Sequence, residues 1–138
     1  MTSSSEDSNV DRHFEDFPLH KFLGLSIAEK REGYARIAMD TGPNTLGGVG
    51  GSVHGGVLAA LVDVVILQAL FAVPDPNVKP AGTADLNITY LRPALGKRIY
   101  AEGQVVKKGR QLAMVEVSIT DDDDRLCGRG RALYSFRA

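Results

Sequence analysis

The chain has little of what would place it in several classes of protein. Its 138 residues contain one cysteine, Cys127, so no disulfide can form within the chain and a cytoplasmic location is expected. The three histidines and this cysteine are too widely scattered for a metal site, so we expect no bound metal. A net charge of −1 gives no basic surface for nucleic acid or for an anionic membrane. The N-terminus also lacks the basic start and apolar core of a secretory signal.

What is present is the composition of a soluble globular protein, with 43% hydrophobic and 24% charged residues. The length is sufficient for one domain with a hydrophobic core. Residues 1–12 are polar, and we expect them to form a disordered tail. A single domain is expected over residues 13–138.

The most apolar stretch of the chain follows a glycine-rich loop at residues 42–52. Within the range 57–73 only Asp63 and Gln68 are polar. The run is slightly short for a membrane span and carries an ionisable residue near its middle. It therefore predicts a core helix, beginning at about Gly55 and buried on every side. A buried carboxylate is costly unless it is paired or hydrogen-bonded, so Asp63 requires an explanation.

The remaining segments predict a short helix and a set of strands. The short helix is expected within 13–23, and two strands joined by a turn at 25–29 and 34–40. After the long helix the apolar period changes to two, which predicts strands at 83–92, 98–107, 112–120 and 125–137. Short links between these four strands favour an antiparallel meander.

One long helix with a curved antiparallel sheet is an α+β architecture. A single sheet that covers one helix leaves strand edges unpaired. Pairing of edges between subunits would satisfy them, so we expect at least a homodimer.

Two motifs in this order carry a resemblance to a known family. Residues 54–63 read HGGVLAALVD and residues 83–93 read TADLNITYLRP, followed by Gly96 and by the pair 109–110, Gly-Arg. Over about residues 19–136 the chain resembles the hotdog-fold acyl-CoA thioesterases of the phenylacetic-acid-pathway and 4-hydroxybenzoyl-CoA type. The resemblance implies a helix wrapped by a curved sheet, dimers with a continuous sheet, and often homotetramers. It also implies hydrolysis of an acyl-CoA to free acid and coenzyme A, with no metal or redox cofactor.

The spacing of two motif residues argues for a site shared between subunits. Gly55 and Asp63 are eight residues apart, which is about 12 Å along one helix. One thioester carbon cannot lie within reach of both groups on the same helix. Two antiparallel helices related by a two-fold axis can bring the start of one near the middle of the other. The resemblance implies the same arrangement, with Gly55 from one subunit and Asp63 from its partner.

The two groups suit thioester hydrolysis. The first N–H groups of a helix have no partner within it and lie at the positive end of its dipole. Gly55 has no side chain, so a substrate oxygen can approach its N–H as in an oxyanion hole. The structural alternative for Gly55 is a helix start that merely needs a small residue. Asp63 would act as the general base on water or as the nucleophile that forms an anhydride, and both roles stay open.

Three further residues are assigned through the resemblance. Thr83 matches a position where related enzymes carry a Ser or Thr that orients water or the carboxylate. His54 is expected to shape the loop and position the amide of Gly55. The family commonly has an Asn six residues before this His, where the chain has Gly48. We therefore interpret the glycine-rich loop as carrying an insertion, with Asn44 as the candidate and the longer loop as a wider acyl pocket or a gate.

The substrate would also need contacts outside the reacting groups. Coenzyme A carries phosphates that need cations, and the acyl group needs a pocket lined by the helix. The candidates for substrate binding are Gly56, Gln68, Arg92, Lys107, Lys108 and Arg110. Aromatic, short-chain and medium-chain acyl groups all suit the motif.

Each candidate also has a structural interpretation. Asp63 would cap a neighbouring loop or pair with an arginine, His54 would be a hydrogen-bonded structural histidine, and Thr83 an ordinary β-branched strand residue. The acidic run 121–124 is interpreted as a solvated turn, because it lacks the spaced ligands of a calcium loop. Cys127 is interpreted as a strand residue.

Two rival functions stay open beside thioester hydrolysis. A hotdog hydratase or dehydratase would use an acidic residue with a catalytic His, and the predicted helix contains no His. A non-catalytic acyl-CoA-binding module or sensor is the other alternative. Neither a helix-turn-helix nor a basic N-terminal arm accompanies the motif, as a DNA-binding sensor would require.

Overall fold

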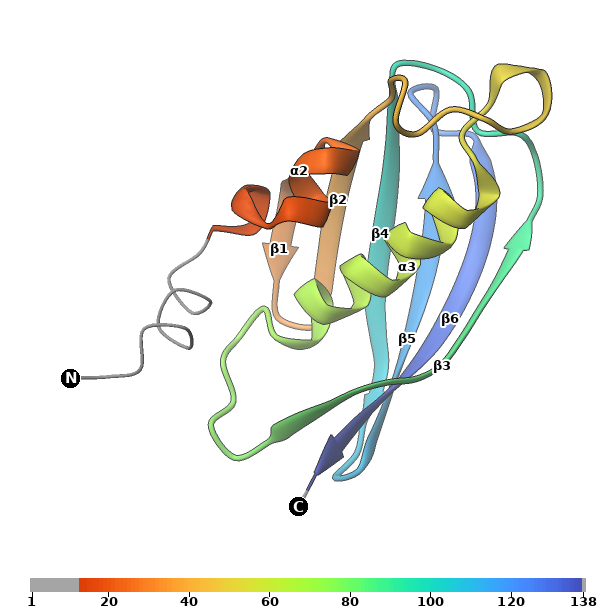
Figure 1. Ribbon diagram of the computed structural model, residues 1–138. Helices are drawn as coiled ribbons and strands as arrows, with labels where there is room; N and C mark the ends of the chain where they lie inside the picture. Colours follow the sequence, from red (N-terminus) through yellow and green to blue (C-terminus); the bar gives the residue numbers. More distant parts are fainter. Residues whose placement is uncertain (1–12, 138) are drawn as a thin grey trace.

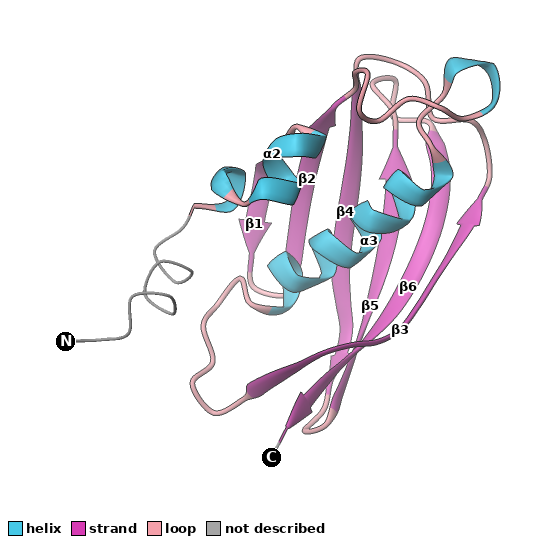
Figure 2. Cartoon of the chain, in the orientation of Figure 1, coloured by secondary structure: helices cyan, strands magenta, loops and turns pink. Residues whose placement is uncertain are grey.

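A computed structural model describes residues 13–137. Figures 1 and 2 show one long helix lying across one face of a curved sheet. In chain order the elements are η1 (Phe14–Asp16), α2 (Pro18–Leu23), β1 (Leu25–Arg31), β2 (Tyr34–Asp40), η2 (Val49–Gly51), α3 (Gly55–Leu70), β3 (Lys79–Tyr90), β4 (Arg98–Lys108), β5 (Leu112–Thr120) and β6 (Leu126–Arg137). The predicted elements are confirmed with small shifts at their ends, and none of the helices in this part of the chain could cross a membrane. The tail predicted for residues 1–12 lies outside the described residues.

The six strands form one antiparallel sheet in the order β1-β2-β4-β5-β6-β3, which confirms the α+β architecture. The predicted meander is wrong in one pairing, because β3 pairs with β6 and β2 lies beside β4. Residues 91–97 cross the end of the sheet instead. Hydrogen bonds from Leu91 N–H to the Cys127 carbonyl (2.8 Å) and from Val53 N–H to the Ala94 carbonyl (3.0 Å) hold this crossing in place. The short link thus joins an edge strand to a central one.

The core lies between α3 and the concave face of the sheet. Its fully buried side chains include Ile37, Met39, Ile99, Val115, Val117, Ile119, Leu61, Val62, Val65 and Ile66. Those that lie in strands alternate along the chain with residues that point to the opposite face of the sheet, because successive side chains of a strand point to opposite faces. A Cβ on Gly130 of β6 would lie only 3.1 Å from the Val62 side chain. The absence of a side chain at this position therefore lets α3 approach the sheet closely.

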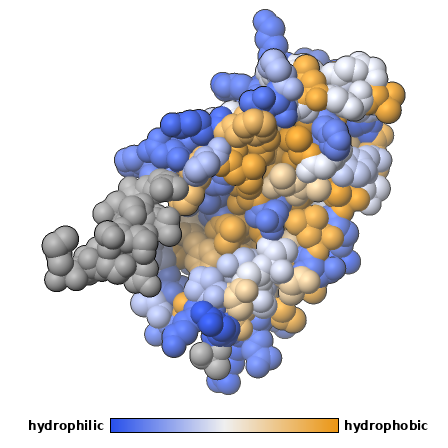
Figure 3. Space-filling model, in the orientation of Figure 1, coloured by the Kyte–Doolittle hydropathy of each residue, from blue (hydrophilic) through white to orange (hydrophobic). Residues whose placement is uncertain are grey.

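One side of α3 is not covered by the rest of residues 13–137. Gly56 and Asp63 are exposed, and Ala60 and Leu67 are half-buried. Their spacing of four, three and four residues places them on one face of the helix. The prediction of a helix buried on every side, with Asp63 inside, is therefore wrong for the single chain. Figure 3 shows apolar side chains gathered on the side of the molecule that carries α3, with polar residues around them.

Strands β1 and β3 form the two edges of the sheet. β3 spans 12 residues, most of which are exposed. Its pairing with β6 shifts register between Pro80 and Gly82 and again between Thr83 and Asp85, after which it runs regularly to Tyr90. An edge strand with a long regular segment offers N–H and C=O groups to a further strand.

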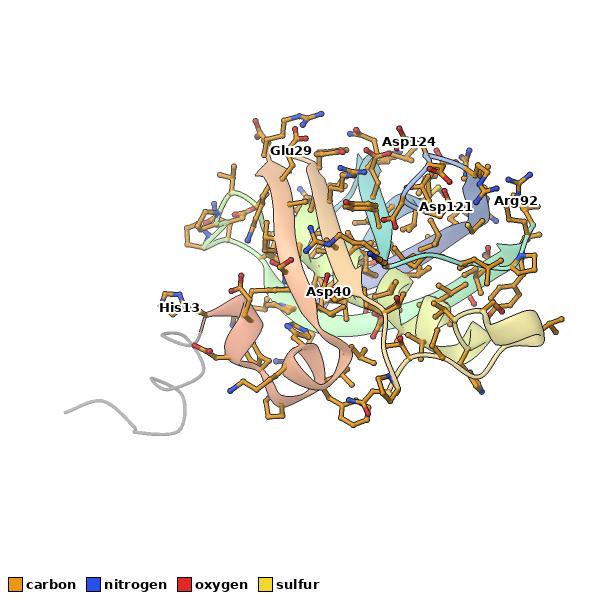
Figure 4. The ribbon with its side chains drawn as sticks, turned by 90° about the horizontal axis from the view of Figure 1, so that it is seen from above. His13, Glu29, Asp40, Arg92, Asp121 and Asp124 are labelled. Atoms are coloured by element: carbon orange, nitrogen blue, oxygen red, sulfur yellow. The ribbon has the colours of Figure 1, made fainter. Side chains whose placement is uncertain are left out.

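The acidic run between β5 and β6 is a structured turn, in which Figure 4 labels Asp121 and Asp124. Asp121 is only 1% exposed, so the prediction of a solvated turn is wrong for this residue. Its carboxylate accepts hydrogen bonds from the N–H of Asp123 (2.9 Å), the N–H of Arg125 (3.0 Å) and the Arg125 Nε (2.9 Å). Burial alone would raise the pKa of Asp121, but these hydrogen bonds outweigh it and lower the pKa below its ordinary value.

Asp121→Asn should destabilise the fold at neutral pH by about 1–2 kcal/mol, because it removes a charge-assisted bond to Arg125. A carboxyl whose folded pKa is depressed contributes stability above its unfolded pKa and loses it as the pH falls through the folded pKa. The difference from wild type should therefore shrink below about pH 4. Urea unfolding of both proteins at pH 7 and pH 3 measures this difference in stability. Asp124→Asn is the matched control, since Asn tolerates the left-handed conformation of this residue (φ 60°). Equal destabilisation at both pH values would contradict the prediction.

Candidate active site

Asp63 projects from the middle of α3 toward the edge strand β3. The Thr83 hydroxyl donates a hydrogen bond to the Asp63 Oδ1 at 2.7 Å. Thr83 pairs in register with Tyr134 of β6, and burial together with the nearby Asp63 charge raises the pKa of that tyrosine. The contact expected between Thr83 and the carboxylate is therefore present. It fixes one carboxylate oxygen of Asp63, a residue that is itself exposed.

The start of α3 presents one unpaired amide. His54 is the N-cap, and its Nδ1 accepts the N–H of Gly56 at 3.0 Å. The next two amides, of Val57 and Leu58, donate to the His54 carbonyl at 2.9 and 3.3 Å. Within residues 13–137 the Gly55 N–H donates to no acceptor. It is thus the donor at the positive end of the helix that remains available to a ligand.

Tyr90, at the last position of β3, contacts the same helix start. Its hydroxyl donates to the Gly55 carbonyl at 2.7 Å. A Cβ built on Gly55 would lie 3.3 Å from the Tyr90 ring. Position 55 therefore needs a glycine for two reasons, because both the Tyr90 ring and a ligand must approach its backbone closely. Sequence reasoning missed Tyr90 as a site residue: its place within the motif at 83–93 was visible, but that place does not indicate a contact with Gly55.

A pocket of about 390 Å³ opens beside Gly55. It is lined by the glycine-rich loop, the first turn of α3 and the segment after β3, and its apolar lining includes Val49, Val53 and Leu58. Among the described residues that line it, Arg92 is the one basic residue, and Figure 4 shows it projecting outward from the loop after β3. The pocket can hold an apolar chain next to the free amide, with a cation at its mouth.

The glycine-rich loop is anchored at its base and open at its tip. The Asn44 side chain donates to the Phe22 carbonyl at the end of α2 (3.0 Å), and the Thr45 carbonyl accepts the His54 N–H (2.8 Å). At the tip, Gly50 has a φ of 64°, which favours glycine, and Val49 is 83% exposed. Asn44 thus ties the loop to α2, and its predicted catalytic role stays a prediction.

The other predicted cations lie at the opposite end of α3. Lys108 pairs with Asp75 at 3.4 Å and lies over the Phe71 ring. Lys108 and Arg110 line a surface cavity of about 1080 Å³, and Lys107 lines a neighbouring one. The 16 residues of α3 span about 24 Å, so within one chain these cations do not join Gly55.

The structure also bears on Gln68 and on the expected absence of a metal. Gln68 accepts a hydrogen bond from Lys30 of β1 at 3.1 Å, so it lies between helix and sheet edge and not beside Asp63. In residues 13–137 no three side chains of His, Cys, Asp or Glu form a cluster suited to a metal ion. Catalysis without a metal or redox cofactor stays a prediction.

One long helix across a curved six-stranded antiparallel sheet is the hotdog fold. The PaaI protein of the E. coli phenylacetic acid degradation operon has the same fold, with a TM-score of 0.80 and 24% identity over 99% of this chain and 97% of that one. Residues 50–128 match the Thioesterase superfamily. The chain therefore belongs to the thioesterase superfamily and is a thioester hydrolase, as the sequence motifs indicated.

Relatives by sequence agree with this assignment. A protein of Halobacterium salinarum, classed by name among esterases, is 35% identical over 123 residues, which cover 83% of this chain and 78% of the relative. The medium/long-chain acyl-CoA thioesterase YigI of Salmonella typhimurium is 26% identical over 130 residues, which cover 85% of this chain and 84% of the relative.

His54→Ala should destabilise the protein by about 1 kcal/mol, because it removes the acceptor for the Gly56 N–H at the helix start. His54→Asn should recover most of this loss, since Asn is a favoured N-cap whose oxygen accepts the same amide. Urea unfolding of the three proteins at pH 7 provides the comparison. If the Ala and Asn variants were equally stable, the capping role of His54 would be wrong.

Proposed function

We propose that the protein hydrolyses acyl-CoA thioesters to a free acid and coenzyme A, in sites shared between two subunits. The observation that carries the proposal is the unpaired Gly55 N–H at the start of α3, beside an apolar pocket. The name of the YigI relative, an acyl-CoA thioesterase, supports acyl-CoA as the substrate class.

The Gly55 N–H acts on the thioester carbonyl. Attack on this group builds negative charge on its oxygen, and a fixed donor at the positive end of a helix stabilises that charge. Such a donor typically contributes about 3–4 kcal/mol to the transition state. The pocket beside Gly55 holds the apolar part of the substrate next to the reacting carbon.

Asp63 acts on the opposite face of the carbonyl. As general base it takes a proton from a water that adds to the carbonyl carbon, and the carbon–sulfur bond then breaks to release the CoA thiolate. As nucleophile its free oxygen adds directly, and water hydrolyses the resulting anhydride. In both routes the hydrogen bond from Thr83 holds one oxygen and directs the other toward the substrate.

A dimer brings the Gly55 N–H of one subunit and the Asp63 carboxylate of the other to one site. The open face of α3 at Gly56, Ala60, Asp63 and Leu67 and the free β3 edge both require a cover. A second copy covers them when two β3 strands pair antiparallel about a two-fold axis, which continues the sheet from one subunit to the other.

The contacts along β3 indicate the register of this pairing. Thr83 touches Asp63 near one end of the regular segment, and Tyr90 touches Gly55 at the other end. Pairing Thr83 of one subunit with Tyr90 of the other places the two strands about 4.8 Å apart at this point. The Asp63 of one subunit then lies beside the Gly55 of its partner.

The coenzyme A phosphates need cations near this shared site. Arg92 lies at the pocket that contains Gly55 and is the first candidate. Lys107, Lys108 and Arg110 lie at the far end of α3 and would serve the site built with the partner's Gly55. Gly56 and Gln68 remain candidates for contacts along α3.

Asp63→Asn should reduce thiol release from acyl-CoAs by about a hundredfold or more, because Asn cannot act as base or nucleophile. The residue is exposed and the change is nearly isosteric, so the Tm should stay unchanged. A panel of aromatic, short-chain and medium-chain acyl-CoAs, followed with a thiol reagent, measures the rate and identifies the preferred acyl group. Asp16→Asn, at an exposed position of η1, is the control. A folded Asp63→Asn that kept its rate would overturn the mechanism, and hydration of an enoyl-CoA without thiol release would overturn the reaction.

Gly55→Pro should lower kcat by about 10²–10³-fold, because proline lacks the N–H that binds the oxyanion. Proline is favoured at the first helical position, and His54 already has the extended conformation that a following proline requires (φ −57°, ψ 133°). Gly55→Ala is the matched control, since it adds the same Cβ beside Tyr90 but keeps the N–H. An equal loss in both variants would assign the effect to the Cβ instead of the donor.

Mixing the two inactive variants tests whether the site is shared. A heterodimer of Gly55→Pro and Asp63→Asn contains one site with both native residues and one with neither. Random mixing by co-refolding should therefore restore about a quarter of the wild-type rate. A site contained in one chain would show no recovery.

A further inference from the structure

We propose that Tyr90 is a positioning residue for the oxyanion donor: its hydroxyl fixes the Gly55–Gly56 peptide and thereby the direction of the Gly55 N–H. The inference rests on the proposed function and extends it to a residue outside the expected catalytic set. It stands on the hydrogen bond from the Tyr90 hydroxyl to the Gly55 carbonyl.

The Gly55–Gly56 peptide is held at both ends. Its carbonyl accepts from the Tyr90 hydroxyl at 2.7 Å, and its N–H donates to the His54 Nδ1 at 3.0 Å. A peptide unit is planar, so two hydrogen bonds on opposite sides fix its orientation. Two successive glycines would otherwise be the most mobile pair of residues in the helix start.

The preceding peptide is held as well. The His54–Gly55 peptide carries the Gly55 N–H, and its carbonyl accepts hydrogen bonds from the N–H groups of Val57 (2.9 Å) and Leu58 (3.3 Å). The His54 N–H, in the peptide before it, donates to the Thr45 carbonyl at 2.8 Å. The two peptide planes that meet at the Gly55 Cα are therefore both fixed by neighbours. The Gly55 N–H is the donor of this turn that remains unpaired within residues 13–137. A donor already oriented in the free enzyme needs no reorganisation when charge develops, which is the basis of oxyanion stabilisation.

The Tyr90 ring adds a second constraint. It occupies the space in which a Gly55 side chain would lie, 3.3 Å from the Cβ position, and it lines the pocket. The backbone that carries the ring is held by the sheet, because Tyr90 pairs in register with Gly128 of β6 and the N–H of the next residue, Leu91, donates to the Cys127 carbonyl. The orientation of the donor is thus tied to the sheet and not only to the helix.

The test removes the hydroxyl alone. Tyr90→Phe keeps the ring against Gly55, so the fold and the pocket should be preserved and the Tm unchanged. Loss of one hydrogen bond should lower kcat by about five- to tenfold. KM should change by less than about twofold, because the oxyanion contact forms in the transition state. Tyr34→Phe is the matched control. It removes the hydroxyl of Tyr34, which donates to Glu102 of β4. Tyr34 begins β2, at the end of that strand remote from the start of α3.

A second readout is independent of turnover. The ¹⁵N order parameters of the Gly55 and Gly56 amides should fall from about 0.85 toward 0.6 in Tyr90→Phe and stay at the wild-type value in Tyr34→Phe. Failure of the wild type to cleave any acyl-CoA would overturn the proposed function, while the order parameters would still decide the role of Tyr90. Unchanged order parameters would overturn the inference, as would an unchanged kcat in an active enzyme. A fall in kcat accompanied by an equal rise in KM and a lower Tm would also overturn it, since it would indicate a merely structural role.

Discussion

The rise of an α-helix is the constraint on which the proposed site depends. Gly55 and Asp63 lie on one helix, about 12 Å apart along its axis, and the buried side of that helix packs against the sheet. No rearrangement of side chains brings a backbone N–H and a carboxylate at this separation to one carbonyl group. If both groups act on one carbonyl, as we propose, the two groups of one chain belong to different sites. The proposed site then needs a partner subunit.

The two faces of α3 carry different kinds of side chain, which suit the proposed arrangement. One face carries large branched side chains that fill the core, and the close approach at Gly130 fixes how deeply it lies. The other face carries Gly56, Ala60 and Asp63, whose small or polar side chains permit a second helix to approach. A carboxylate on this face is solvated in the single chain and loses water only when a partner covers it. Desolvation of Asp63 would thus accompany assembly of the proposed dimer.

Much of the fold was predictable because it depends on local patterns. The alternation along β2, β4 and β5 identified their buried faces, and a run without charges apart from Asp63 identified α3. Strand pairing was less predictable, since it depends on which segments meet in space, and β3 was wrongly placed beside β4. The sequence could not reveal the exposed face of α3, because alanine and glycine count as apolar residues whether they are buried or exposed.

The candidate site was predictable to a similar degree. The motifs identified Asp63, Gly55 and Thr83, and the structure brings Thr83 to the Asp63 carboxylate. The contact of Tyr90 with Gly55 joins residues 35 positions apart, so no local pattern could indicate it. Asp121 was missed for a different reason: its partners Asp123 and Arg125 are local, but the acidic neighbours suggested a solvated turn although the residue is buried.

Strand β3 connects the two halves of the proposed site. One end holds the carboxylate through Thr83 and the other holds the oxyanion donor through Tyr90, so each half is oriented before assembly. The dimer then needs to specify only the register between two β3 edges. A slip that shifts one strand by two residues preserves the sidedness of its side chains but displaces the halves by about 7 Å. Such a dimer would be continuous in its sheet and yet inactive. The register shifts between Pro80 and Gly82 and between Thr83 and Asp85 limit this slip, because they end the regular edge beside Thr83, which holds the carboxylate.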